Sequence, residues 1–205
     1  MLPPDLAHEL SLWQKGINYI AGIDEVGRGS WAGPVVAAGV MLPKNFSIPE
    51  VFGDSKQLKP YERRKLAQII TKQAISYYIS EIGVSVINKI GIGNASQVAY
   101  RQVVKFLHPK PQFILMDAFY IKHLNRKNQL AIKKGDQKIA SIAAASVIAK
   151  VYRDNLMKKL ARIYPNYGFG KHKGYGTKSH QEAIRVHGFL KVHRTSYNLK
   201  FLLNA

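Results

Sequence analysis

The uncharged stretch IASIAAASVIA at residues 139–149 most constrains the fold of this chain. It occurs in a sequence of 205 residues with 31 Lys and Arg, only 12 Asp and Glu, and a formal net charge of +19. A helix of that composition is buried on nearly every side, so other elements must cover it. We predict one long helix over 138–163, with its first half in the core of a globular domain.

Short apolar runs before that helix indicate strands, and periodic segments indicate further helices. We predict strands at 17–24, 35–42, 77–86, 112–117 and 129–134. We predict helices at 4–15, 60–75, 95–107, 178–187 and from about 197. The first helix would bury one face, made of Leu6, Leu10 and Trp13. This order indicates an α/β domain with a mixed sheet over 1–163, followed by a basic, tyrosine-containing helical extension over 164–205.

The charge balance favours a polyanionic partner, and nucleic acid is the first choice. An anionic membrane surface is the alternative, but no apolar run reaches the roughly 18 residues of a membrane span. The start, MLPPDLAHEL, has two acids and no basic run, which is not typical of a signal peptide. The absence of cysteine fits a cytoplasmic protein. Any metal would need carboxylate or histidine ligands.

Four of the few acids lie where a site is expected. Asp24, Glu25 and Asp117 lie where strands are predicted to end, and Asp136 precedes the long helix. Carboxylates gathered in a partly buried site repel one another, and bound cations relieve that repulsion. Neighbouring strand residues point to opposite faces, so the strand should end or bulge at Asp24 and Glu25. The alternative is that all four are ordinary surface acids.

Two loops could contact phosphates. In the glycine loop over 27–33, Gly27 and Gly29 would let backbone amides approach a nucleotide, with Arg28 nearby. This loop could equally be a simple tight turn. Ser55 and Lys56, in the sequence DSK, could bind a phosphate or could merely precede a helix.

The later chain offers further candidates. Ser146, Lys150 and Arg153 share one face of the long helix and could meet the substrate. The alternative is a simple change from buried to exposed helix. Tyr175 lies between two glycines in a basic segment, which suits stacking on a nucleotide. The histidines lack zinc-site spacing, and we expect a surface basic role for His172, His180, His187 and His193.

In this order, the motifs resemble the bacterial ribonuclease HII family over most of the chain. The matching segments are GIDEVGRG (22–29), AGPVVAAGV (32–40), DSKQL (54–58), LMD (115–117), KGD (134–136), ASIAAASVIAKVYRD (140–154), YGFGKHKGYGT (167–177) and HRTSY (193–197). The resemblance implies a ribonuclease H-like fold, in which helices flank a mixed five-stranded sheet and a helical C-terminal extension follows.

The resemblance also implies an activity. The enzyme would hydrolyse RNA in RNA–DNA hybrids and cut 5′ of ribonucleotides in duplex DNA, leaving 3′-hydroxyl and 5′-phosphate ends. Its metal ligands would be Asp24, Glu25, Asp117 and Asp136. Gly27, Arg28 and Gly29 would sense the 2′-hydroxyl, and Tyr175 would pack on the deoxyribose at the junction. Phosphate contacts would come from Ser55, Lys56, Ser146 and Lys150.

The sequence departs from the family at two places. Ser30 and Trp31 stand where the family usually has proline and a small aliphatic residue, and Ala118-Phe119 stands where glycine usually follows the third acid. We hypothesise hydrolysis with two Mg²⁺ or Mn²⁺ ions about 3.5–4 Å apart. We expect a monomer. The rival functions are a DNA junction resolvase on the same fold and a non-enzymatic RNA-binding protein.

Overall fold

The computed structural model describes residues 3–49, 52 and 58–202. A five-stranded sheet forms its centre, in the order β3-β2-β1-β4-β5. The strands are β1 (Ile20–Val26), β2 (Val35–Met41), β3 (Ser76–Ile82), β4 (Phe113–Asp117) and β5 (Gln129–Ile132). β2 pairs antiparallel with β1 and β3, whereas β4 pairs parallel with β1 and β5. The predicted mixed five-stranded sheet is therefore confirmed.

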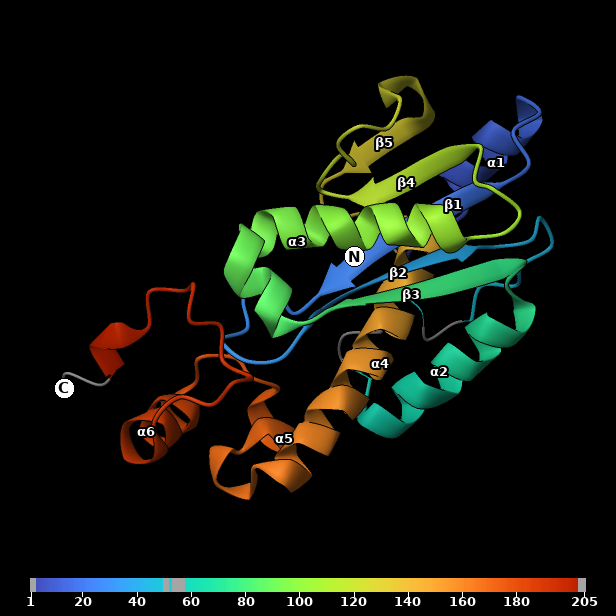
Figure 1. The fold of residues 1–205 in the computed structure, drawn as a ribbon. Helices are drawn as coiled ribbons and strands as arrows, with labels where there is room; N and C mark the ends of the chain where they lie inside the picture. Colours follow the sequence, from blue (N-terminus) through green and yellow to red (C-terminus); the bar gives the residue numbers. More distant parts are fainter. Residues whose placement is uncertain (1–2, 50–51, 53–57, 203–205) are drawn as a thin grey trace.

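Helices cover both faces of the sheet, as Figure 1 shows. α3 (Val84–Phe106) lies on one face, whereas α2 (Pro60–Gln73) and α4 (Ala140–Ile163) lie on the other. The alternation of side chains along β2 explains this division, since successive strand residues point to opposite faces. Val35, Ala37 and Met41 pack with α3, while Val36, Ala38 and Val40 pack with α2 and α4.

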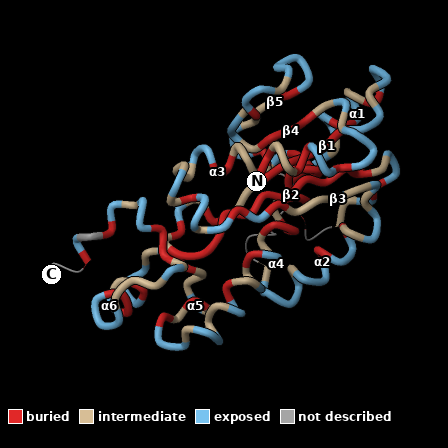
Figure 2. Tube along the Cα trace, in the orientation of Figure 1, coloured by how far each residue is buried: buried red, intermediate tan, exposed pale blue. Residues whose placement is uncertain are grey.

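The uncharged half of α4 lies in the core, as its composition predicted. The α4 residues Ala140–Ala145 and Val147–Ala149 are buried, and Figure 2 shows the central strands buried with them. Glu9 of α1 (Ala7–Gln14) supports the start of this helix, because its carboxylate accepts a hydrogen bond from the Ser141 amide at 2.9 Å. A carboxylate at a helix N-terminus satisfies an amide without an intrahelical partner.

Three sequence predictions need correction. Leu10 is 49% exposed, because Glu9 and Trp13 occupy the buried side of α1. α3 begins at Val84, well before residue 95, and is kinked at Gly91, which has φ 77°. The helix predicted from about 197 is only the 3₁₀ turn η5 (Lys200–Leu202) within the described residues.

The C-terminal segment after α4 has a small core of its own. It contains η4 (Pro165–Tyr167), α5 (Phe169–His172) and α6 (Lys178–His187). Phe169 and Ile184 belong there to one cluster with Met157 of α4 and Ala32 of the glycine loop. The domain boundary near 164 stays a prediction. No helix in the described part of the chain is both long enough and apolar enough to span a bilayer.

Candidate active site

Asp24 and Glu25 lie within a regular part of β1. The antiparallel ladder with β2 continues through both residues to the pair Val26–Val36. The prediction that the strand ends or bulges at this acidic pair is therefore wrong. The parallel ladder with β4 does stop here, at Ile23–Met116. The acids thus lie on an edge of β1 that β4 no longer covers.

The two acids meet different helices because they lie on opposite faces of the sheet. Asp24 faces α4, where the Ser146 hydroxyl donates a hydrogen bond to its carboxylate. Glu25 faces α3, where the Tyr100 hydroxyl donates to its Oε2 atom. Each carboxylate is therefore held by a donor from a different layer of the fold.

Asp117 is the last residue of β4, and its register places it next to Asp24. The last ladder pair is Ile23–Met116, so the next position along both strands joins Asp24 with Asp117. The Oδ1 atom of Asp117 accepts a hydrogen bond from the Gly135 amide at 2.7 Å. That bond anchors η3 (Gly135–Gln137), which carries Asp136.

One pocket of about 280 Å³ collects these side chains at the end of the sheet. Its lining comprises Asp24, Glu25, Val26, Arg63, Asp117, Asp136, Ser146, Val147, Lys150 and Tyr175. All four predicted carboxylates and three predicted substrate contacts therefore share a single cavity. The reading of the acids as ordinary surface residues does not account for this arrangement.

The pocket disfavours carboxylate charge. Burial is the largest cause and raises the pKa of Asp24 from 3.8 to about 8. The hydrogen bond from Ser146 opposes this rise, whereas the charges of Glu25 and Asp117 add to it. Burial also raises the pKa of Glu25, against hydrogen bonds from Tyr100 and Arg28. A cation among these oxygens would remove the repulsion and favour the ionised form.

The donor set fits a hard divalent cation. Four carboxylates supply only oxygen ligands, which Mg²⁺ and Mn²⁺ prefer. Within the described residues, no three His, Cys, Asp or Glu side chains already form a group that could hold a metal ion. The geometry explains this, because Glu25 and Asp117 are turned toward protein donors.

Buried arginines fix the glycine loop beside the pocket. Arg194 is fully buried and donates from Nη1 to the Arg28 carbonyl at 2.8 Å. Its Nε and Nη2 atoms both donate to the Gly33 carbonyl, at 3.0 and 2.9 Å. The Tyr197 hydroxyl donates to the same Arg28 oxygen. The HRTSY segment therefore determines where the loop lies.

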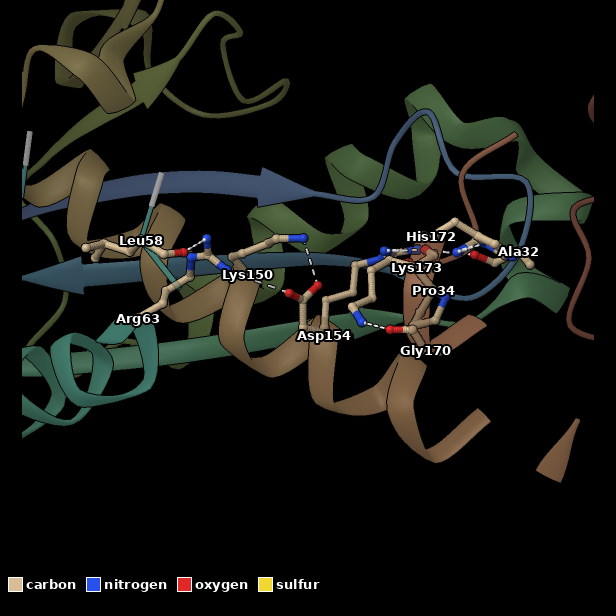
Figure 3. Close-up of polar contacts among 11 residues, drawn as sticks. Ala32, Pro34, Leu58, Arg63, Lys150, Asp154, Gly170, His172 and Lys173 are labelled. Atoms are coloured by element: carbon tan, nitrogen blue, oxygen red, sulfur yellow. Dashed lines mark hydrogen bonds and ion pairs between the residues drawn. The ribbon is translucent and has the colours of Figure 1, made fainter. Parts of the chain in front are cut away.

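Arg153 of α4 also forms hydrogen bonds with the glycine loop. It is fully buried and donates to the carbonyls of Pro34, Lys173 and Ala32 at 2.9, 3.0 and 3.2 Å. The proposal that Arg153 meets substrate together with Lys150 is therefore wrong. Its guanidinium instead joins the glycine loop to the C-terminal segment, and Figure 3 labels Ala32, Pro34 and Lys173, the three residues whose carbonyls accept from it.

Lys150 and Arg63 present the positive charge of the pocket. The Lys150 ammonium lies 2.7 Å from Asp154 Oδ1, one turn along α4. Arg63 of α2 lies 3.9 Å from Asp154 Oδ2 and donates to the Leu58 carbonyl at 2.7 Å. Figure 3 labels all three side chains and marks their contacts. Asp154 thus holds two basic groups beside the four acids.

Arg28 contacts one of the residues that departs from the family motif. Its Nη1 atom lies 3.4 Å from Glu25 Oε1, and its guanidinium lies 4.4 Å from the centre of the Phe119 ring. The same departure includes Ala118, which has φ 58°, a conformation that glycine adopts more easily. The family glycine at this position thus has a physical reason.

Tyr175 borders the pocket and is 38% exposed. The amide of Trp31 donates to the Gly174 carbonyl at 2.7 Å, just before the tyrosine. A Cβ atom on Gly176, just after it, would lie 2.3 Å from the Trp31 indole. The unusual Trp31 therefore packs directly against the tyrosine segment. Ser55 and Lys56 lie outside the described residues.

Comparison with known proteins shows the family. The family model described as ribonuclease HII matches residues 21–200 of this chain. The chain belongs to the ribonuclease HII family. It is 47% identical over 195 residues to the ribonuclease HII of Caldanaerobacter subterraneus subsp. tengcongensis, covering 95% of this chain and 80% of that one. It is 47% identical to that of Chloroherpeton thalassium, covering 97% of this chain and 98% of the relative.

Solved structures show the same fold. The ribonuclease H2 of Pyrococcus horikoshii superposes with a TM-score of 0.73 at 24% identity, over 89% of this chain and 96% of that one. Bst ribonuclease HIII, solved in complex with Mn²⁺, gives a TM-score of 0.66 at 19% identity, over 94% and 71% of the two chains. The predicted ribonuclease H-like fold is confirmed. As a ribonuclease HII, the chain is a metal-dependent endoribonuclease.

Sequence reasoning missed several residues that shape this ribonuclease HII site. They are Arg63, Tyr100 and Arg194, whereas Arg153 was named as a substrate contact and not as a buried side chain that holds the loop. An arginine in a chain of this charge gives no sign of lying inside the protein. The signal that could have found Arg194, and the structural role of Arg153, is their place within two of the quoted segments, HRTSY and ASIAAASVIAKVYRD.

Proposed function

We propose that this ribonuclease HII hydrolyses the RNA strand of RNA–DNA hybrids and cuts 5′ of ribonucleotides embedded in duplex DNA. The products would carry 3′-hydroxyl and 5′-phosphate ends. The observation that carries this proposal is the shared pocket, which combines four carboxylates with Lys150, Arg63 and an exposed Tyr175. Membership of the ribonuclease HII family supports the same substrates.

The four acids are proposed as the metal ligands. Asp24, Glu25, Asp117 and Asp136 would hold two Mg²⁺ or Mn²⁺ ions, which when bound supply a more acidic water and neutralise charge on the scissile phosphate. The raised pKa values of Asp24 and Glu25 support this role, since both carboxylates lie in surroundings that favour a nearby cation.

The remaining pocket residues would bind and orient the substrate. Lys150 and Ser146 would contact phosphate oxygens, although in the structure Lys150 pairs with Asp154 and Ser146 donates to Asp24. Substrate binding would therefore exchange the Lys150–Asp154 ion pair for one with phosphate. The same exchange is open to the neighbouring Arg63. Ser55 and Lys56 are proposed as phosphate contacts on the strength of the DSK motif alone.

Two elements would supply specificity for the ribonucleotide. The glycine loop Gly27–Gly29 borders the acids through the contact of Arg28 with Glu25, which suits a role in sensing the 2′-hydroxyl. That hydroxyl is the group that separates RNA from DNA at one position. The exposed Tyr175 ring would pack against the deoxyribose at the RNA–DNA junction.

Cleavage of a labelled DNA duplex that contains one ribonucleotide tests the proposal. The reaction is run with Mn²⁺, with Mg²⁺ and with a chelator, beside an all-DNA duplex, a branched DNA and a continuous hybrid. We expect metal-dependent cutting 5′ of the ribonucleotide and of the hybrid, with both all-DNA substrates intact. Cutting of branched DNA would support a junction resolvase instead. Salt-sensitive binding without cutting in either metal would contradict catalysis.

A further inference from the structure

Three histidines of the C-terminal segment are stacked and contact the backbone at Gly174 and Tyr175. The His172 and His180 rings lie 4.5 Å apart at an interplanar angle of 15°, and the His180 and His193 rings lie 5.3 Å apart at 29°. His180 and His193 are buried, with 0% and 1% exposure. The prediction of a surface basic role is therefore wrong for these two residues. The exposed His187 is the one that fits it.

The contacts of His180 and His193 assign their tautomers. A carbonyl oxygen only accepts, so His180 Nδ1, at 2.9 Å from the Tyr175 carbonyl, carries the hydrogen. A backbone amide only donates, so His193 Nδ1, at 2.7 Å from the Leu190 amide, carries none. The longer 3.3 Å contact of this atom with the Leu190 oxygen then yields to the shorter bond.

These tautomers form one continuous chain of hydrogen bonds. His193 keeps its hydrogen on Nε2 and donates to the free Nε2 lone pair of His180 at 3.2 Å. The chain therefore runs from the Leu190 amide through both rings to the carbonyl of Tyr175. Burial lowers the pKa of each ring to about 4, so both rings are neutral at neutral pH. A proton added to either ring would leave two donors facing each other.

The third ring, that of His172, holds the backbone of Gly174, the residue before Tyr175. His172 Nδ1 accepts a hydrogen bond from the Gly174 amide at 3.2 Å. Its Nε2 atom lies 2.7 Å from the Tyr167 carbonyl and donates to it. Side-chain hydrogen bonds thus hold the backbone at Gly174 and at Tyr175, directly beside the pocket that the tyrosine ring borders.

We propose that His180 and His193 are positioning residues, which fix the backbone of Tyr175 and thereby aim its ring at the nucleotide beside the scissile bond. This inference rests on the proposed role of Tyr175 at the RNA–DNA junction. Neither histidine lines the carboxylate pocket. Their effect therefore passes through the tyrosine and requires a substrate that the tyrosine contacts.

Cleavage kinetics of His193→Phe test this proposal. Phenylalanine keeps the stacked ring but removes the donor to His180. We expect kcat/KM on the single-ribonucleotide duplex to fall about fivefold to tenfold, the effect of one lost hydrogen bond, and that on a continuous hybrid to fall less than about twofold. His193→Gln, which can still donate, should restore most of the activity. His187→Phe, at the exposed histidine, is the matched control.

A double-mutant cycle separates positioning from general structure. With Tyr175→Ala as the background, His193→Phe should cause no further loss on the junction substrate, because the ring that it aims is absent. Equal losses on both substrates, or additive losses with Tyr175→Ala, would overturn the proposal.

The tautomers provide a measurement that does not depend on activity. Nitrogen NMR of the wild-type histidines should find the hydrogen on Nδ1 of His180 and on Nε2 of His193. A hydrogen on Nε2 of His180 would contradict the chain even if His193→Phe does not fold. If Tyr175→Ala itself leaves junction cleavage unchanged, the proposed role of the tyrosine fails, while the tautomers still decide whether the chain exists.

Discussion

Arg194 donates from Nη1 to the carbonyl oxygen of Arg28 at 2.8 Å, across 166 residues of sequence. Through this bond the HRTSY segment near the C-terminus holds the glycine loop that follows β1. The Nε and Nη2 atoms on the opposite edge of the guanidinium donate to Gly33, so the planar group makes hydrogen bonds along two of its edges in one geometry. A planar guanidinium has no substitute among the other cationic side chains.

Replacing Arg194 by lysine should therefore weaken the fold and the site together. We expect the free energy of unfolding to fall by about 2 kcal/mol or more, because several charge-assisted hydrogen bonds are lost from a buried position. Urea unfolding measures this loss. Arg185→Lys is the control, since its contact with Glu182 is at the surface and should be worth under about 0.5 kcal/mol. Equal losses of unfolding free energy in the two variants would contradict the conclusion that the Arg194 hydrogen bonds hold the glycine loop.

The raised pKa of Asp24 predicts a pH dependence of the metal-free protein. Folding raises this pKa from 3.8 to about 8, so the folded state holds the proton more tightly. Its contribution to stability is complete below pH 3.8 and is lost as the pH rises to about 8. In the presence of a chelator, Asp24→Asn should therefore raise the free energy of unfolding of the metal-free protein at pH 8 by a few kcal/mol, the order of magnitude that this pKa shift implies.

Unfolding curves in chelator at pH 5 and pH 8 measure the effect of Asp24→Asn. Wild-type protein should lose more stability than the variant between these two values. Adding Mn²⁺ at pH 8 should stabilise the wild type more than the variant, since the variant lacks one charged ligand. Parallel pH curves for the two proteins would contradict the buried position of this carboxylate.

Ala118 offers a test of the departure from the family motif. Its φ of 58° costs an L-residue about 1–2 kcal/mol, a strain that glycine does not have. Ala118→Gly should therefore raise the free energy of unfolding by about 0.5–1 kcal/mol, after the entropy of glycine is subtracted. Ala131→Gly, in the regular strand β5, should have the opposite sign. A lower free energy of unfolding in both Ala118→Gly and Ala131→Gly would contradict backbone strain at Ala118.

The two glycines of the loop should respond differently to alanine. Gly27 has φ 91°, and a Cβ atom there would lie 2.2 Å from the buried Arg153 Nε, so Gly27→Ala should destabilise the fold by about 2 kcal/mol or more. A Cβ atom on Gly29 would meet no atom within 4 Å beyond its chain neighbours, so Gly29→Ala should change stability by less than about 0.5 kcal/mol. Gly29→Ala should instead lower the rate of cleavage, if the substrate backbone approaches Gly29. Normal cleavage by Gly29→Ala would exclude that approach.

The sequence predicted the parts of the fold that depend on composition and order. The uncharged run at 139–149 predicted the buried helix, and the acids late in the predicted strands at 17–24 and 112–117 predicted that Asp24 and Asp117 lie at one end of the sheet, although β1 continues past Asp24 to Val26. These features are visible in one sequence because local pattern determines them. The expected monomer and the boundary near 164 stay predictions.

The parts that failed depend on distant partners. Glu9 is buried because it caps α4, which lies far along the chain, and no local pattern reveals such a contact. Arg153 and His180 looked like surface basic groups, yet each is buried with hydrogen-bond partners from other segments. The bulge predicted at Asp24 is absent. The ladder between β1 and β4 stops at Ile23 and Met116, which leaves the edge of β1 open at Asp24 and Glu25.

Single-turnover cleavage by Asp117→Asn tests the central claim most directly. The change removes one carboxylate charge from the pocket but keeps the side-chain size and the oxygen that accepts from Gly135. Glu182→Gln, at the surface of α6, is the control. We predict that Asp117→Asn binds the single-ribonucleotide duplex as tightly as the wild type and loses cleavage in Mn²⁺ and in Mg²⁺. Near-normal turnover of that variant would contradict the assignment of the four carboxylates as the metal site.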